Sequence, residues 1–120
     1  MYNLVEYKRD ICIRSFNFAK RIINLAISLR KKTSLYSISD QIIRSGTSIG
    51  ANIEEAQNSS SKKEFIHTMT IALKEARETN YWLRLIVECK LISQEKMELL
   101  MKENVELIKI ITTIVKNSKK

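Results

Sequence analysis

The residues best suited to metal binding or acid–base catalysis are one histidine and three glutamates in the third quarter of the chain. Glu64 and His67 are spaced as Glu-x-x-His, the pair that forms half of a carboxylate-bridged di-metal site in helical bundles. Such a site needs a second pair, and His67 is the sequence's one histidine. No serine or cysteine nucleophile lies in register with it. We therefore expect no catalytic residue, no metal and no cofactor, with Glu64 as a helix cap. Glu75 and Glu78 are expected to pair with arginines in the core or at an interface (Arg44, Arg77 or Arg84).

The two cysteines are the remaining candidates for metal or redox chemistry. Cys12 and Cys89 lie far apart in the sequence, without a Cys-x-x-Cys motif. This usage does not predict a disulfide framework. Both are expected to pack as small buried hydrophobic residues.

Basic side chains dominate the charge of the chain. Its 120 residues carry 21 lysines and arginines against 13 acids, a formal net charge of +8. Residues 1–33 hold much of the excess, because Lys8, Arg9 and six further cations stand there against Glu6 and Asp10. Such a surface attracts the phosphates of RNA or DNA, although a compositional bias towards lysine gives the same imbalance without a function. The predicted nucleic-acid-binding residues are the six further cations: Arg14, Lys20, Arg21, Arg30, Lys31 and Lys32.

An aromatic pair offers a second way to bind nucleic acid. Tyr81 and Trp82, beside Arg84, could stack on an unpaired base. Aromatic rings at this spacing more often pack within a bundle, with the indole N–H hydrogen bonded at its rim. Membrane-surface binding is not expected, because the cations of residues 10–32 surround their helix instead of gathering opposite an apolar face.

Apolar periodicity places these residues on four helices. The chain has no proline and two glycines, as expected of a helical protein. Helices are predicted over residues 10–32, with Asp10 as N-cap, over 37 or 39 to 58, over 61–89 and from 93 into the basic tail. Short connections make neighbouring helices antiparallel. The predicted fold is all-α, an antiparallel up-and-down four-helix bundle forming a single domain over residues 1–120.

The apolar positions of the first predicted helix recur at spacings of three and four. The sequence predicts neither a membrane-spanning segment nor a signal for export. No apolar run approaches the roughly 20 residues that span a bilayer, and no signal peptide is recognisable. A cytoplasmic location is therefore expected, with no small-molecule substrate. The apolar positions assigned to the first helix are Cys12, Phe16, Ala19, Ile22, Ile23, Ala26 and Leu29.

The second predicted helix contains both glycines of the chain. Gly46 lies on its apolar face, and Gly50 follows four residues later beside that face. Each glycine costs about 1 kcal/mol of helix propensity relative to alanine, a cost that the close approach of another helix offsets. The core face of this helix is predicted to consist of Ile38, Ile42, Gly46, Ile49, Ile53 and Ala56.

The opposite face of the second helix is unusually rich in small and hydroxyl residues for a solvated surface. Such residues weaken an exposed helix without a compensating gain. We therefore predict that a neighbouring subunit packs there, although an exposed face that has merely drifted to serine, threonine and alanine is the alternative. The predicted oligomer interface consists of Arg44, Thr47, Ser48, Ala51 and Glu55.

These segments also carry a family resemblance. The stretch RSGTSIGANIEEA, followed by SSSKKEFIHTMTIALKEARETNYWLRL, resembles the four-helix-bundle proteins encoded in 23S rRNA intervening sequences. The similarity runs from about Tyr7 to Val115 and is most specific from Arg44 to Ala56 and from Lys63 to Leu83. Many members have Pro where this chain has Gly50, and Gly where it has Gln57.

The resemblance implies an antiparallel four-helix bundle that assembles into a ring, most commonly a homopentamer. It implies no enzymatic activity, because none is established for the family. The similar accessory proteins of diversity-generating retroelements bind nucleic acid and a reverse transcriptase. The expected function is therefore RNA or nucleic-acid binding by a basic homo-oligomer. A protein–protein scaffold and a reverse-transcriptase accessory role are the alternatives.

Overall fold

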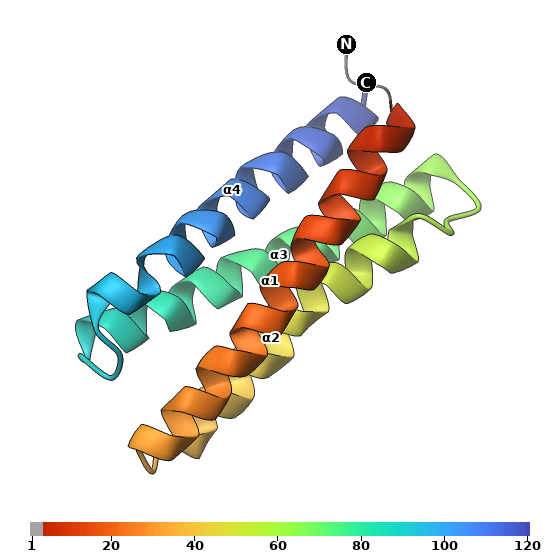
Figure 1. Ribbon diagram of the computed structural model, residues 1–120. Helices are drawn as coiled ribbons and strands as arrows, with labels where there is room; N and C mark the ends of the chain where they lie inside the picture. Colours follow the sequence, from red (N-terminus) through yellow and green to blue (C-terminus); the bar gives the residue numbers. More distant parts are fainter. Residues whose placement is uncertain (1–3) are drawn as a thin grey trace.

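The computed structural model contains four helices and, over the residues that it describes, no strand. It describes residues 4–120, and only the backbone of residues 4–9. The helices are α1 (Leu4–Lys32), α2 (Tyr36–Ala56), α3 (Lys62–Glu88) and α4 (Gln94–Ser118). Figure 1 shows that consecutive helices run in opposite directions. The predicted all-α, antiparallel up-and-down bundle is confirmed.

The starts of α1 and α2 differ from the prediction. Asp10 lies inside α1 instead of capping it, because the helix already begins at Leu4. The side chains of Glu6, Lys8 and Arg9, which entered the charge prediction, lie outside the described residues. The helix α2 begins at Tyr36, and Ser39 is buried within it, where its hydroxyl lies 3.3 Å from the carbonyl oxygen of Ala26.

The capping signals of the second half of the chain are confirmed, with one difference. The hydroxyl of Ser61 accepts the N–H of Glu64 at 3.1 Å. The Glu64 carboxylate returns to Ser60, not to Ser61, and accepts its N–H at 3.0 Å and its hydroxyl at 2.7 Å. These bonds lower the pKa of Glu64. Ser93 caps α4 by accepting the N–H of Lys96 at 3.4 Å.

Of the seven apolar positions assigned to the first helix, only Ile22, Ala26 and Leu29 are buried in the core. Phe16 and Ile23 are exposed, and Cys12 and Ala19 are partly buried. The helix carries two apolar stripes, and the prediction merged them, although only one can face the core. The exposure of Cys89 also contradicts the expectation of a buried thiol. The hydrophobic residues of α1 that are buried are Ile11, Phe18, Ile22, Leu25, Ala26 and Leu29.

The core face of α2 was predicted correctly apart from partly buried Ile38. Ile42, Ile49 and Ile53 are fully buried, as is the Gly46 backbone. A Cβ at Gly46 would lie 2.7 Å from Cγ2 of Ile22, and one at Gly50 would lie 3.2 Å from the hydroxyl of Ser15. The glycines therefore allow α1 to approach the α2 backbone closely, as the sequence predicted.

A buried polar cluster joins α3 and α4. Asn104 has no exposed surface; its Oδ1 accepts a hydrogen bond from Asn80 at 2.9 Å, and its Nδ2 donates to the Ala76 carbonyl at 3.1 Å. Along α4, Asn104 lies between the buried hydrophobic residues Leu100 and Leu107. A polar residue in an apolar face is easily assigned to solvent, yet it is tolerated in a core when its hydrogen bonds are satisfied.

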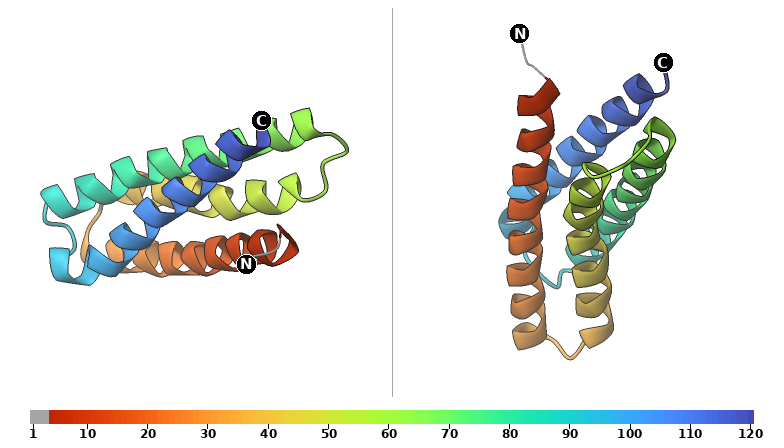
Figure 2. Two further views of the ribbon diagram at one scale, coloured as in Figure 1. Left: turned by 90° about the horizontal axis from the view of Figure 1, so that it is seen from above. Right: turned by 90° about the vertical axis from the view of Figure 1, so that its right-hand side faces the viewer.

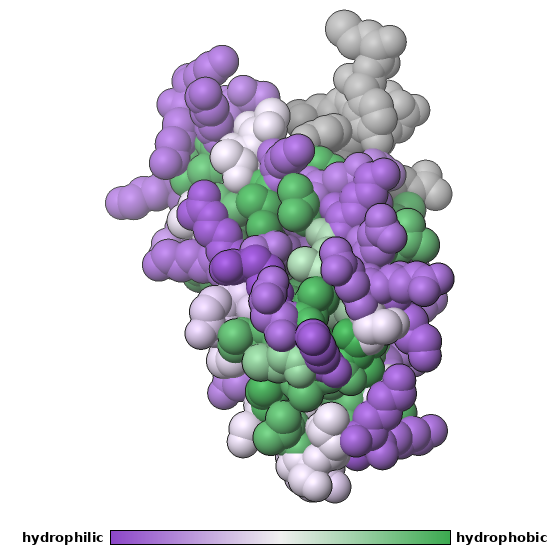
Figure 3. Space-filling view, turned by 90° about the vertical axis from the view of Figure 1, so that its left-hand side faces the viewer, coloured by the Kyte–Doolittle hydropathy of each residue, from purple (hydrophilic) through white to green (hydrophobic). Residues whose placement is uncertain are grey.

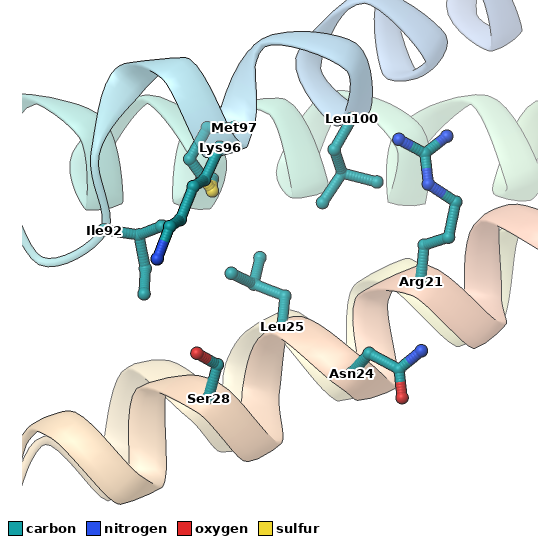
Figure 4. A pocket seen from close by; sticks show the side chains of 8 residues that line it. All are labelled: Arg21, Asn24, Leu25, Ser28, Ile92, Lys96, Met97 and Leu100. Carbon is teal, nitrogen blue, oxygen red and sulfur yellow. The ribbon is translucent and has the colours of Figure 1, made fainter.

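The contact between α1 and α4 is the loosest of the four between neighbouring helices. Figure 2 shows α4 running obliquely across the bundle. A cavity of about 300 Å³ lies between the two helices, with Leu25 and Leu100 facing each other across it and Arg21 and Lys96 among its other lining residues (Figure 4). Figure 3 views the molecule from the left-hand side of Figure 1 and shows hydrophobic residues (green) among hydrophilic ones (purple). None of the described helices is long and apolar enough to cross a membrane.

Candidate nucleic-acid and subunit interfaces

Two of the six predicted nucleic-acid-binding residues are ion-paired within the chain. Arg14 on α1 contacts two glutamates of α4, with Nη2 2.7 Å from Oε1 of Glu103 and 2.8 Å from Oε2 of Glu106. Arg30 pairs with the Asp40 carboxylate, and its Nε donates to the Ser39 hydroxyl at 3.0 Å. Their charges are balanced by carboxylates, so they attract phosphate less than an unpaired cation does.

The other four predicted cations are exposed. Lys20, Arg21, Lys31 and Lys32 form no ion pair with the acids of residues 10–120. Lys20 lies 6.0 Å from the centre of the Phe16 ring, and Arg21 lines the cavity between α1 and α4. Lys31 and Lys32 end α1. The structure therefore leaves two groups of free cations, one in mid-helix and one at the helix end.

Lysine and arginine have different environments in this protein. The five ion pairs of residues 10–120 all use an arginine, namely Arg14, Arg30 or Arg44. Every lysine in that range is exposed, and none is paired with an aspartate or glutamate. Three arginines thus engage five carboxylates between helices, while the positive charges of the lysines and of Arg21, Arg77 and Arg84 remain at the surface.

The outer face of α2 is smooth, and its hydroxyl groups are satisfied. Thr47 donates to the Ile43 carbonyl at 2.6 Å, and Ser48 donates to the Arg44 carbonyl. Ala51 and Glu55 are exposed. Hydroxyls bonded to their own helix can be covered without leaving an unsatisfied donor. Whether a subunit packs on this face stays a prediction.

Arg44, the cation of the predicted oligomer interface, is engaged within its own chain. Its Nη1 lies 3.1 Å from Oε2 of Glu75, and its Nη2 pairs with Glu78. This confirms the expectation that the two glutamates pair with an arginine. Trp82 donates its indole N–H to Glu78 at 3.0 Å. The indole bond and, after it, the Arg44 pair lower the pKa of the Glu78 carboxyl.

Two roles were predicted for the aromatic pair on α3, base stacking and packing within the bundle. Trp82 fulfils the second. Trp82 is half-buried and hydrogen bonded at the rim of the bundle. Tyr81 is exposed and meets the Trp82 ring edge-on at 5.2 Å between centroids, with the Arg84 guanidinium 5.8 Å from the Tyr81 ring. Tyr81 thus contacts both Trp82 and Arg84 while remaining exposed, and Trp82 is part of the ion-pair cluster of α2 and α3.

An exposed apolar surface on α1 was missed by the sequence analysis. Ile13, Phe16, Ile23 and Ile27 are 50, 58, 42 and 48 % exposed. We call these four residues the α1 stripe; Lys20 lies at its centre. The signal was available, because spacings of three, seven and four along α1 repeat on the side opposite Ile11, Phe18 and Ile22. A helix that is apolar on two sides is typical of burial on both.

The residues considered for metal or acid–base chemistry do not converge. His67 is exposed, and Glu64 caps α3 through Ser60. Over the residues that the structure describes, no group of three or more His, Cys, Asp or Glu side chains is placed to hold a metal ion. Cys12 is partly buried, and burial, with a smaller contribution from Glu54, raises the pKa of its thiol.

The comparisons with known proteins decide the family. The sequence model of the 23S rRNA-intervening sequence protein family matches residues 8–113. The chain belongs to this family. A crystal structure of a protein of unknown function from the S23 ribosomal protein family of Bacteroides thetaiotaomicron is similar to it, with 41% identity and a TM-score of 0.88. The alignment covers 92% of this chain and 98% of that one. Among curated proteins, no sequence matches this chain.

Membership confirms the family resemblance of the sequence. It supports the four-helix fold but assigns no activity. The B. thetaiotaomicron protein shares the fold over nearly the whole chain, and the glycine-mediated contact between α1 and α2 lies within the region that the family model matches. The family is one of unknown function. Function therefore has to be argued from the surfaces described above.

Proposed function

We propose that this intervening-sequence family protein is a non-enzymatic homo-oligomer, a ring of about five subunits, that binds structured RNA in the cytoplasm. The observation that carries the proposal is the unpaired lysine surface. Since five carboxylates are engaged by arginines, the net charge of +8 is presented mainly by exposed lysines. A ring repeats that surface in each subunit, which strengthens phosphate binding by counterion release without a sequence code.

The binding surface that we propose centres on Arg21, Lys31 and Lys32. These residues are exposed, free of ion pairs with described acids, and carried by one helix. Arg14 and Arg30 support it indirectly, because they hold α1 against α4 and against the start of α2. The cavity between α1 and α4 extends the surface through Lys96, which lines it together with Arg21.

A titration of the purified, nuclease-treated protein tests this proposal. Structured rRNA fragments and random duplex DNA of equal length are titrated at several salt concentrations. We expect micromolar or tighter binding of RNA, weaker binding of DNA, and an affinity that falls steeply with salt. Flat, negligible binding at about 150 mM salt would overturn the RNA-binding proposal.

A charge-matched pair of variants locates the surface. Arg21, Lys31 and Lys32 are replaced together by glutamine, and the control replaces Lys74, Lys102 and Lys109, which are exposed on α3 and α4. Both variants lose three positive charges. The first is expected to lower RNA affinity at least tenfold more than the control. Equal losses would mean that net charge alone, and not this surface, governs binding.

The α1 stripe favours a second candidate, a protein–protein scaffold. Exposed apolar side chains contribute little to phosphate binding but are typical of protein interfaces. If the triple glutamine variant retained a protein partner while the wild-type protein bound no RNA, the scaffold function would take the place of RNA binding.

A further inference from the structure

The α1 stripe is a contiguous apolar surface on a single helix. Its four residues lie on the side of α1 opposite buried Ile11, Phe18 and Ile22. At half exposure, side chains of this size leave on the order of 400 Å² of apolar surface, about half of the roughly 800 Å² that each partner buries in a standard interface. Single exposed apolar residues are common, but a patch of this size typically marks a contact with another macromolecule.

Lys20 indicates which kind of contact the stripe makes. It lies midway between Ile13 and Ile27 in the sequence and is exposed on the same side. If two copies paired their stripes antiparallel about a two-fold axis, the two Lys20 ammonium groups would meet at that axis. Like charges at the centre of an apolar contact are strongly unfavourable. The stripe is therefore suited to a different surface of the second copy.

The outer face of α2 has the complementary properties. Thr47, Ser48 and Ala51 are small, and the hydroxyls of the first two are already bonded to their own helix. Glu54 and Glu55 are exposed on α2 and form no ion pair with described residues, so they offer carboxylates to a lysine. The bulky side chains of the α1 stripe match the small residues of α2 in shape, and Lys20 matches the free carboxylates of α2 in charge.

We propose that the α1 stripe of one copy packs against the outer face of α2 of the next copy, with Lys20 paired to Glu54 or Glu55. This head-to-tail contact rests on the proposed homo-oligomer and names the surfaces that build it. The helices α1 and α2 are adjacent in the bundle (Figure 2). The contact joins two different faces of the same chain and is therefore heterologous, and such a contact builds a ring where its rotation closes after a whole number of subunits.

The first experiment measures the mass of the full chain in solution by analytical ultracentrifugation over a range of concentrations. The wild type is expected at a multiple of 14.0 kDa. Replacing Phe16 and Ile23 by serine should reduce it to 14.0 kDa with unchanged helicity. The control replaces Leu99 and Val105, which are 71 and 40 % exposed on α4, and should keep the wild-type mass.

A mixing experiment tests the head-to-tail arrangement. The Phe16→Ser/Ile23→Ser variant keeps its α2 face, and an Ala51→Arg variant keeps its α1 stripe. Each is expected to be monomeric alone, and their mixture is expected to form a dimer of twice 14.0 kDa. If Ala51→Arg alone remained oligomeric, or the mixture stayed monomeric, the pairing of these two faces would be wrong.

A charge exchange tests the ion pair. Lys20→Glu, and separately Glu54→Lys with Glu55→Lys, should each raise the dissociation constant of the oligomer at least tenfold. The combined variant should recover most of the loss, and no recovery would refute the pair. A wild type that is oligomeric but insensitive to all these changes overturns the proposed contact alone. A wild type that is monomeric throughout overturns the homo-oligomer as well.

Discussion

Gly46 of α2 lies directly against Ile22 of α1. A Cβ at Gly46 would fall 2.7 and 2.8 Å from Cγ2 and Cγ1 of Ile22, which is fully buried and has no free direction in which to move. The contact joins two helices whose axes must come close for Ile49 and Ile53 to reach the core. The Ile22 side chain fills the space that a Cβ would need, which explains why Gly46 stands inside a helix.

The two glycines are expected to differ in their response to alanine. Gly46→Ala should lower the free energy of unfolding by about 1–3 kcal/mol, because overpacking against Ile22 outweighs the gain of up to about 1 kcal/mol in helix propensity. At Gly50 the nearest atoms are 3.2–3.3 Å away, so Gly50→Ala should cost less. Urea denaturation followed by circular dichroism measures both. A more harmful change at Gly50 would contradict the packing described for Ile22.

Asn104 is expected to be the most sensitive polar residue of the core. Asn104→Ala removes a buried side chain and leaves the Asn80 amide without its acceptor, so we expect a loss of about 2–3 kcal/mol in the free energy of unfolding. Asn80→Ala should cost less, because Asn80 is only partly buried. The double variant should lose less than the sum of the two, and strict additivity would mean that the two amides are not coupled.

The Glu78 cluster predicts an acid-sensitive part of the stability. Because its folded-state pKa is lowered, Glu78 stabilises the fold above its unfolded pKa, and that stabilisation is lost as the pH falls through the folded pKa. Between about pH 6 and pH 3, Glu78→Gln should flatten the decrease in the free energy of unfolding by up to about 1 kcal/mol, since the pair is partly solvated. Glu98→Gln, at an exposed residue without an ion pair to described residues, is the control.

Arg14 is expected to matter more for stability than for RNA binding. Arg14→Gln leaves Glu103 and Glu106, which are neighbours on α4, without their shared cation from α1 and should lower the free energy of unfolding by about 1 kcal/mol. Arg21→Gln should leave stability within about 0.5 kcal/mol but reduce the salt dependence of RNA binding by nearly one released counterion. Thermal unfolding and the salt titration separate these effects. The opposite assignment would show that Arg14 contacts the phosphates.

The sequence was sufficient for the number and order of the helices and for the caps of α3 and α4, because capping serines and apolar periodicity are local signals. It also located the close approach at Gly46, since a glycine in phase with Ile42 and Ile49 has few other uses. It failed for α1, where Phe16 and Ile22 lie on different stripes that a single periodic pattern cannot separate. It also missed Asn104, because the partners that satisfy a buried amide come from another helix.

The candidate surfaces divide in the same way. Lysine and arginine look alike when charges are counted along the chain, and only the fold shows that Arg14 and Arg30 are held by acids while Lys31 and Lys32 are not. The exposure of the α1 stripe likewise depends on which side of α1 meets α2. The pairing of Glu75 and Glu78 with an arginine was predicted from the sequence, but the partners of Arg14 and Arg30 were not.

The loose contact between α1 and α4 has a consequence for how the chain folds. Among the described helices, every other contact joins neighbours along the sequence, so most native contacts are local. Proteins with such short-range contacts fold quickly, because little loop-closure entropy is lost before the contacts form. The hairpin of α2 and α3 can form first. The pairing of α1 with α4 closes the longest loop and gains the least packing, so it is expected to be the final step of folding. The same pairing is expected to open first in hydrogen exchange.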